Sequence, residues 1–160
     1  MTGEARPERS VFDCVVDASV GVKLFVVEPL SDQADALFGH LTDTPPARLY
    51  VPDLFFIECA SILWKYVRRY GYPADVARQD LRDLTRLPLR VVSTAALAEE
   101  ALTLGVAHGS TAYDSAYVAL ARRLALPLVT ADEALARRFV EAEPDVQSLR
   151  QWGVGMGGRA

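Results

Sequence analysis

The chain has 160 residues, a formal net charge of −4 and 51% hydrophobic residues. This length suffices for one domain with a sizeable core, and no apolar run approaches the roughly 18 residues needed to cross a bilayer. The N-terminus, MTGEARPERS, is charged where a signal peptide would be apolar, so we expect a cytoplasmic protein. The negative charge argues against bulk electrostatic attraction to nucleic acid, but it leaves local contacts open.

The first half of the chain alternates short apolar runs with longer helical patterns. The run FDCVVD is apolar and ends in a carboxylate, as expected of a buried parallel strand. Pro29 separates two helical segments, and Pro52 precedes a long helix. The elements expected up to residue 92 are a strand at 12–17, helical segments at 18–28 and 31–43, a strand at 49–51, helices near 53–70 and 74–86, and a strand at 89–92.

The second half continues the alternation. We expect a helix near 94–107, a Gly-Ser break at 109–110, a helix at 111–126, a strand at 127–130, a helix at 132–139 and a short strand near 146–149. Short strands alternating with helices predict a three-layer α/β/α sandwich with a mainly parallel sheet. We assign 12–149 to this domain, 1–11 to a flexible leader and 150–160 to a C-terminal tail.

The sulfur and imidazole side chains suggest no metal site. Cys14 and Cys59 lie inside apolar runs and match no metal-ligand spacing, so we interpret both as reduced core residues. The chain has two histidines, His40 and His108, which we interpret as surface or core residues rather than ligands.

Arginine pairs occur at 68–69, 122–123 and 137–138. Guanidinium groups bind phosphates bidentately, so each pair could contact a nucleic acid. Each pair also falls near the end of a predicted helix, where cations are favoured by the helix dipole. Both interpretations stay open at this point.

Acidic side chains follow the predicted strands. Asp17 ends the first strand, and Asp132 lies just past the strand LVT. Asp114 opens the helix leading into that strand, and Glu58 lies on the long helix after the second strand. Because function gathers beyond the carboxyl ends of parallel strands, these acids could meet at one edge of the sheet. Asp17 alone could equally be the N-cap of the next helix.

Capping offers an alternative role for two of these acids. Thr111 with Asp114 three residues later resembles a capping arrangement. Thr130 with Glu133 forms a capping box, which would make Asp132 an acid of the first helical turn, favoured by the dipole. Each of these acids taken alone fits the cap better than a functional site.

Capping cannot explain Glu58. It lies in the middle of the predicted helix, within the apolar stretch FFIECASILWK, and its neighbours one turn away are Leu54, Phe55, Ser61 and Ile62. No cation is therefore placed to pair with it along the helix. A buried carboxylate without a partner is costly unless it is protonated or bound. The alternative is a side chain that points outward.

Carboxylates that converge without a basic partner would repel one another and raise their own pKa values. A divalent cation would resolve this repulsion. Oxygen ligands favour Mg²⁺ or Mn²⁺, whereas Zn²⁺ would require a Cys and His set that this sequence lacks.

The segments VVDASV, FFIECASIL and TAYDSAYVALARRLALPLVTAD resemble those of the PIN-domain nucleases and, within them, the VapC-type toxins of bacterial toxin–antitoxin pairs. The resemblance extends from about residue 12 to 149. It implies a PIN-like fold and an acidic pocket that binds Mg²⁺, with Mn²⁺ as a substitute. It also implies cleavage of single-stranded RNA, of the tRNA or rRNA class, by a metal-activated water.

The resemblance also implies roles for individual residues. Asp17, Glu58 and Asp114 match the core metal ligands of the family, and Asp132 matches a fourth acid that completes a second metal site or orients the water. The small hydroxyl positions near the pocket are matched by Ser19 and Thr130. One departure is Ser61, which stands where many relatives have Asn.

The resemblance implies that the chain forms a homodimer and that a co-expressed antitoxin protein binds it and blocks the pocket. The resemblance places the antitoxin groove along 20–30 and the helix from Ser31, although these residues could equally be ordinary core. One alternative is a PIN nuclease of RNA processing, or a PIN scaffold that binds RNA or protein without catalysis. Another is a receiver domain, which would need a Lys after a late strand, whereas this chain has only Lys23 and Lys65.

Overall fold

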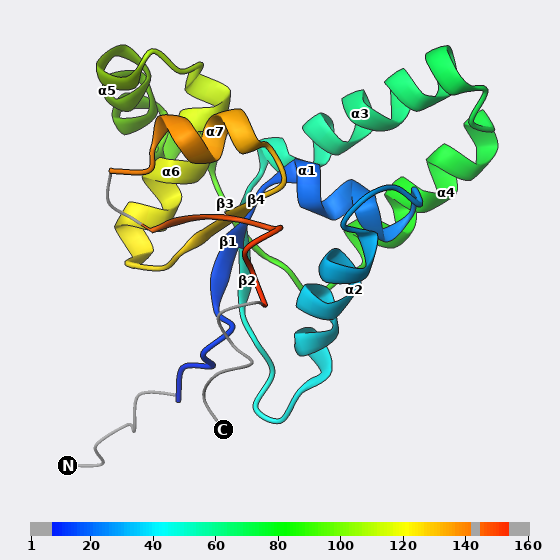
Figure 1. Ribbon diagram of the computed structural model, residues 1–160, viewed down its shortest axis with the longest axis horizontal. Helices are drawn as coiled ribbons and strands as arrows, with labels where there is room; N and C mark the ends of the chain where they lie inside the picture. Colours follow the sequence, from blue (N-terminus) through cyan, green and yellow to red (C-terminus); the bar gives the residue numbers. More distant parts are fainter. Residues whose placement is uncertain (1–7, 142–144, 154–160) are drawn as a thin grey trace.

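The protein is described by a computed structural model covering residues 8–141 and 145–153, with a parallel sheet at its centre (Figure 1). The predicted leader at 1–11 and tail at 150–160 extend outside these residues, so their character stays a prediction. The five strands lie in the order β3-β2-β1-β4-β5 and pair in parallel throughout. Their bounds are Cys14–Val16 for β1, Leu49–Pro52 for β2, Arg90–Val92 for β3, Leu128–Thr130 for β4 and Val146–Ser148 for β5.

The two central strands, β1 and β4, are buried along their whole length. Val15 of β1 lies opposite Tyr50 of β2 on one side and Leu128 of β4 on the other. Burial on both faces explains why these strands are continuously apolar in the sequence. The chain proceeds from β1 outward to β2 and β3 and then returns to the other side of β1. The order therefore reverses between β1 and β4, where parallel sheets bind ligands.

Helices cover both faces of the sheet, so the predicted three-layer sandwich is confirmed. In Figure 1, α5, α6 and α7 lie on one side of the sheet, and α1, α2 and the α3–α4 hairpin lie on the other. The α-helices are α1 (Ala18–Gly21), α2 (Ser31–Gly39), α3 (Leu54–Tyr70), α4 (Ala74–Thr85), α5 (Ala98–His108), α6 (Ala112–Leu124) and α7 (Glu133–Arg138), and the 3₁₀ turns are η1 (Val22–Leu24), η2 (His40–Thr42) and η3 (Thr94–Ala96).

The helical segment expected at 18–28 is shorter than predicted, because it ends with the 3₁₀ turn at Leu24. The valines at 26 and 27 have limited rotamer freedom in a helix, and Pro29 disfavours the helical conformation of the residue before it. The loop is instead held by Lys23, whose Nζ lies 2.8 Å from Glu28 Oε1 and donates to the Pro29 carbonyl at 2.9 Å.

Helix α1 packs closely against α3, which positions the carboxyl edge of the sheet next to the long helix. Phe55, Cys59 and Leu63 form the buried face of α3. A Cβ atom at Gly21 would come within 2.7 Å of Phe55 Cζ, so only glycine permits this approach without a shift. The contact brings the start of α3, and with it Glu58, alongside the end of β1.

The sequence interpretation of the cysteines is confirmed, since Cys14 and Cys59 are free and buried. Among the imidazoles, His40 stacks on Phe12 at 3.5 Å between ring centroids, and His108 packs against Phe139 at 4.8 Å. Within residues 8–141 and 145–153, no helix is both long and apolar enough to span a membrane.

Candidate active site

Four carboxylates lie at the carboxyl edge of the sheet, around the reversal between β1 and β4. Asp17 directly follows β1, and Asp132 follows β4 by two residues. Glu58 lies in the second turn of α3, and Asp114 lies in the first turn of α6. The negative charges act on one another, because those of Asp114 and Asp132 raise the pKa of Asp17. The structure thus brings together four acids that are far apart in sequence.

Asp17 is the most enclosed of these acids and is held by two hydroxyl groups. Ser19 Oγ donates to Asp17 Oδ2 at 2.5 Å, and Thr130 Oγ1 donates to the same oxygen at 3.0 Å. The hydroxyls are themselves fixed, since Ser19 Oγ accepts from the Ala131 amide and Thr130 Oγ1 accepts from the Asp132 amide, both at 3.0 Å. Burial raises the pKa of Asp17, whereas these two hydroxyls lower it. Asp17 occupies the N-cap position of α1, but its side chain makes no capping hydrogen bond.

Glu58 points inward from a mostly apolar helix. Its Oε1 atom is buried and has no hydrogen-bond partner among the described residues. Burial, followed by the charges of Asp17 and Asp114, raises the pKa of Glu58 to about 7. The nearby Tyr117 hydroxyl partly offsets this increase in the pKa of Glu58, although the two side chains form no hydrogen bond of standard geometry. An unpaired carboxylate oxygen of this kind is expensive to bury and is therefore suited to binding a cation.

Asp114 combines the two roles that the sequence left as alternatives. Its backbone amide donates to Thr111 Oγ1 at 3.1 Å, so Thr111 is the N-cap of α6. The Asp114 carboxylate also faces the cluster, because burial and then the charge of Asp132 raise its pKa. The cap is formed by the backbone of Asp114, which leaves the side chain available.

Asp132 has a structural role that differs from the predicted capping box. Its Oδ1 atom accepts from the Ala134 amide at 3.0 Å and the Leu135 amide at 3.1 Å, so Asp132 is itself the N-cap of α7. The predicted box between Thr130 and Glu133 is wrong. The Thr130 hydroxyl is directed to Asp17, and Glu133 Oε1 accepts from Ser148 Oγ at 2.6 Å.

Two residues near the cluster were missed by sequence reasoning. Tyr117 lies one turn after Asp114 on α6, and its buried hydroxyl has no hydrogen-bond partner within the described part of the chain. Arg138 lies in the last turn of α7, and its charge lowers the pKa of Asp114. The spacing of Asp114 and Tyr117 was visible as one helical turn in the sequence. The position of Arg138 depends on how α7 packs, so no local pattern signalled it.

The donor set of this cluster fits a hard divalent cation, since it consists of carboxylate oxygens. The buried, unpartnered Glu58 Oε1 supports the same assignment. The side chains are not gathered into a finished site, because no three Asp, Glu, His or Cys side chains in residues 8–141 and 145–153 are close enough to share an ion. Mutual repulsion of carboxylates without a counter-charge gives a physical reason for this separation.

A separate cavity of about 590 Å³ lies away from the acids, beside the amino ends of β2 and β3. Arg48 and Arg90 line it, and none of the four acids does. The acid cluster at the carboxyl edge of the sheet therefore lies outside this cavity.

Comparisons with known proteins agree with this architecture. The family model of the PIN domain matches residues 14–139. Ribonuclease VapC3 of Pyrobaculum aerophilum is 38% identical over 127 residues, which cover 78% of this chain and 93% of that protein. The solved structure of PAE2754 from Pyrobaculum aerophilum has a TM-score of 0.66 at 22% identity and covers 92% of this chain and 96% of its own. A toxin–antitoxin complex from Klebsiella pneumoniae has a TM-score of 0.58 at 15% identity, with coverages of 84% and 97%.

Proposed function

This chain belongs to the PIN-domain family and is a VapC-type ribonuclease, and we propose from this premise that it cleaves single-stranded regions of RNA with a divalent cation. The substrate is of the tRNA or rRNA class, and the cation is Mg²⁺, with Mn²⁺ as a substitute. One observation carries the proposal. The buried Glu58 Oε1 has no hydrogen-bond partner in the described residues, and the charges of two neighbouring carboxylates act on it.

In this proposal Asp17, Glu58 and Asp114 hold the cation. When bound, the cation lowers the pKa of a water molecule and neutralises charge that builds up on the phosphate. Asp17 is pre-oriented for binding, because both hydroxyl contacts engage Oδ2 and no described residue hydrogen-bonds Oδ1. Ser19 and Thr130 therefore act by fixing the direction of the Asp17 carboxylate.

Asp132 has a more limited part. Its Oδ1 caps α7, which leaves only Oδ2 to orient the attacking water or to complete a second cation site. Thr130 couples the two halves of the cluster, because its hydroxyl donates to Asp17 and accepts from the Asp132 amide. We place Asp132 in the catalytic set on this basis, with a smaller contribution than the other three acids.

Two alternatives differ in what they require of these acids. A PIN scaffold that only binds RNA or protein would not need a buried carboxylate such as Glu58 left without a partner. A PIN nuclease of RNA processing would need the same acids, and it is distinguished by its substrate. The receiver-domain alternative is wrong, because the chain matches the PIN family over residues 14–139.

The test is cleavage of a mixed tRNA and rRNA panel by the purified chain, free of partner, with Mg²⁺, with Mn²⁺ and with EDTA. We expect discrete products with either metal and none with EDTA. Products that persist in EDTA would contradict the metal dependence. A folded chain that leaves every RNA intact in both metals would contradict the nuclease assignment.

The proposal includes two protein partners, an antitoxin and a second copy of the chain in the cytoplasm. Within the stretch 20–30, where the antitoxin groove is predicted, Val20, Val22 and Val26 are core residues and would not contact a partner. Val27 remains 95% exposed and is available to an antitoxin segment. Leu102 and Val106, one turn apart on α5, are exposed apolar residues that suit a dimer contact.

Light scattering tests whether a second copy of the chain is bound, because it measures the mass of the purified protein. The chain has a mass of 17.5 kDa, and we expect the purified protein to have twice this mass. The product of a small gene directly upstream, co-expressed with the chain, should bind it and suppress cleavage. A monomer, or an upstream product that does not bind, would contradict the corresponding partner.

A further inference from the structure

We propose that Lys65 and Arg69 on α3 and Arg138 on α7 bind the backbone phosphates of the RNA strand on opposite sides of the acid cluster, and so position it for cleavage. This inference rests on the proposed function and adds to it the path of the substrate. It also selects which of the basic residues contact RNA, a question that the sequence left open.

Local positive charge is needed because the rest of the molecule repels RNA. The chain has a net charge of −4, and four carboxylates lie at the carboxyl edge of the sheet, where cleavage is proposed. An RNA strand that enters the acid cluster must therefore gain favourable contacts on both sides of the cluster. Phosphate contacts by Lys and Arg supply them and also fix the register of the strand.

The first contacts lie along α3. Lys65 is seven residues after Glu58 and Arg69 is eleven residues after it, which correspond to nearly two and three full helical turns. The two cations therefore extend from the side of α3 that carries Glu58, about 10 and 16 Å further along the helix. Lys65 and Arg69 are both exposed. The row starts at the acid cluster and leads outward along the helix.

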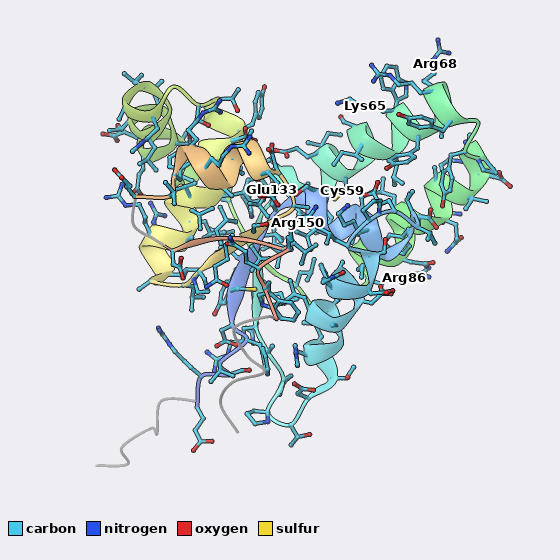
Figure 2. All side chains as sticks on the ribbon, in the orientation of Figure 1. Cys59, Lys65, Arg68, Arg86, Glu133 and Arg150 are labelled. Atoms are coloured by element: carbon cyan, nitrogen blue, oxygen red, sulfur yellow. The ribbon has the colours of Figure 1, made fainter. Side chains whose placement is uncertain are left out.

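This side of α3 is free of α4. The opposite side of α3 is engaged, because Ala60, Leu63 and Val67 line a groove together with residues of α4. Figure 2 shows Lys65 and Arg68 projecting from the side of α3 that faces away from α4. An RNA strand can therefore approach the row without displacing the hairpin.

The second side of the path is formed by α7. Arg138 is exposed in the last turn of α7, whose N-cap is Asp132. Asp132 caps the start of α7, so Arg138, six residues later, lies only about 9 Å from that acid along the helix axis. Helix α7 covers the face of the sheet opposite to α3, so the cations flank the acids from two directions (Figure 1).

The helix-dipole explanation covers only part of this pattern. Arg69 and Arg138 lie in the last turns of their helices, but Lys65 lies one turn earlier. The arginines at 122–123 already contact other residues of the chain. Arg122 forms an ion pair with Glu100 at 3.6 Å, and Arg123 donates to the Ala96 carbonyl at 2.8 Å, so we do not assign this pair to RNA. Among the described residues, Lys65, Arg69 and Arg138 have no ion pair and no side-chain hydrogen bond.

The test measures RNA affinity apart from cleavage. Fluorescence anisotropy of a labelled single-stranded RNA is recorded with the full chain carrying Asp114→Asn, in Mg²⁺, over a range of salt concentrations. Lys65→Ala, Arg69→Ala and Arg138→Ala are each added to this background. We expect each to weaken binding about 5- to 10-fold and to reduce the slope of log affinity against log salt by about 0.7. Lys65→Arg should retain the slope, because it retains the charge.

The matched control is Arg86→Ala. Arg86 is likewise exposed, with a side chain 72% accessible that pairs with Asp83 at 3.4 Å, and it lies just after α4, well apart from Lys65 (Figure 2). It should leave the affinity and the slope unchanged. Losses no larger than those of Arg86→Ala, in a protein whose wild-type chain cleaves RNA, would overturn the path and leave the nuclease assignment intact. A wild-type chain that neither binds nor cleaves RNA would overturn both.

Discussion

Replacing Asp114 with Asn should abolish RNA cleavage, with a loss of about 10³-fold or more, and should leave the fold intact. The variant keeps the shape of the side chain but removes one of the charges that would hold the cation. The N-cap of α6 is preserved, because Thr111 Oγ1 accepts from the backbone amide of residue 114 and not from its side chain. The loss is measured as the initial rate on the RNA that the wild-type chain cleaves best.

Stability separates this effect from simple unfolding. Burial and the charge of Asp132 raise the pKa of Asp114, so its ionised form is disfavoured in the folded state. Asn removes that cost but also loses a first-turn acid, worth about 0.3–1 kcal/mol at a helix N-terminus. We therefore expect a melting temperature within a few degrees of the wild type. An unchanged cleavage rate would remove Asp114 from the mechanism.

Asp132→Asn is the matched control, since Asn is as good an N-cap as Asp. Oδ1 of Asp132 already accepts two backbone hydrogen bonds, and an Asn oxygen can accept both. We expect a loss of about 10- to 100-fold, smaller than for Asp114→Asn. Equal losses in the two variants would assign Asp132 to the central set of ligands.

The strands and their acids could be predicted because the necessary information is local. The run around Val15 and Val16 is apolar without alternation, which indicates burial on both faces, and Asp17 directly follows it. The position of Glu58 in an apolar helix indicated a buried carboxylate in the same way. These features need only the order of residues along one segment.

Features that depend on contacts between distant segments could not be predicted. The sequence TADE fits two N-caps, and the structure selects Asp132 because the Thr130 hydroxyl bonds to Asp17, 113 residues away. Arg138 acts on Asp114 only because α7 packs against β4 and β5 at this edge of the sheet. The loop that follows the first helix likewise involves a distant segment, because the Tyr66 hydroxyl of α3 donates to Glu28, which also pairs with Lys23.

Replacing Glu58 with Gln should stabilise the metal-free protein at pH 8 and should remove its activity. The pKa of Glu58 is raised from 4.5 to about 7 in the folded state, so the folded chain holds this proton more tightly than the unfolded chain. As pH rises from the unfolded value through the folded one, stability falls, because only the unfolded state ionises freely. Gln is neutral throughout and avoids this loss. After allowance for solvent screening of a partly buried group, we expect a gain of about 1–2 kcal/mol.

Urea unfolding in EDTA at pH 8 and pH 5 measures this difference. The gain should be present at pH 8 and largely absent at pH 5, where Glu58 is protonated in the folded wild type. The control is Glu99→Gln, in the exposed first turn of α5, which should give no gain at either pH. A Glu58→Gln variant that is less stable than the wild type at pH 8 would contradict the buried, unpaired state of this carboxylate.

Adding Mg²⁺ or Mn²⁺ should reverse the order of stability. A cation that binds only the folded state stabilises it by mass action, and it competes with the proton for Glu58. The wild type should therefore gain more stability from the metal at pH 8 than at pH 5, and Glu58→Gln should gain less than the wild type at pH 8. A buried carboxylate that weakens the metal-free fold but strengthens the metal-bound one is retained for binding. An equal gain in both proteins would show that Glu58 does not hold the cation.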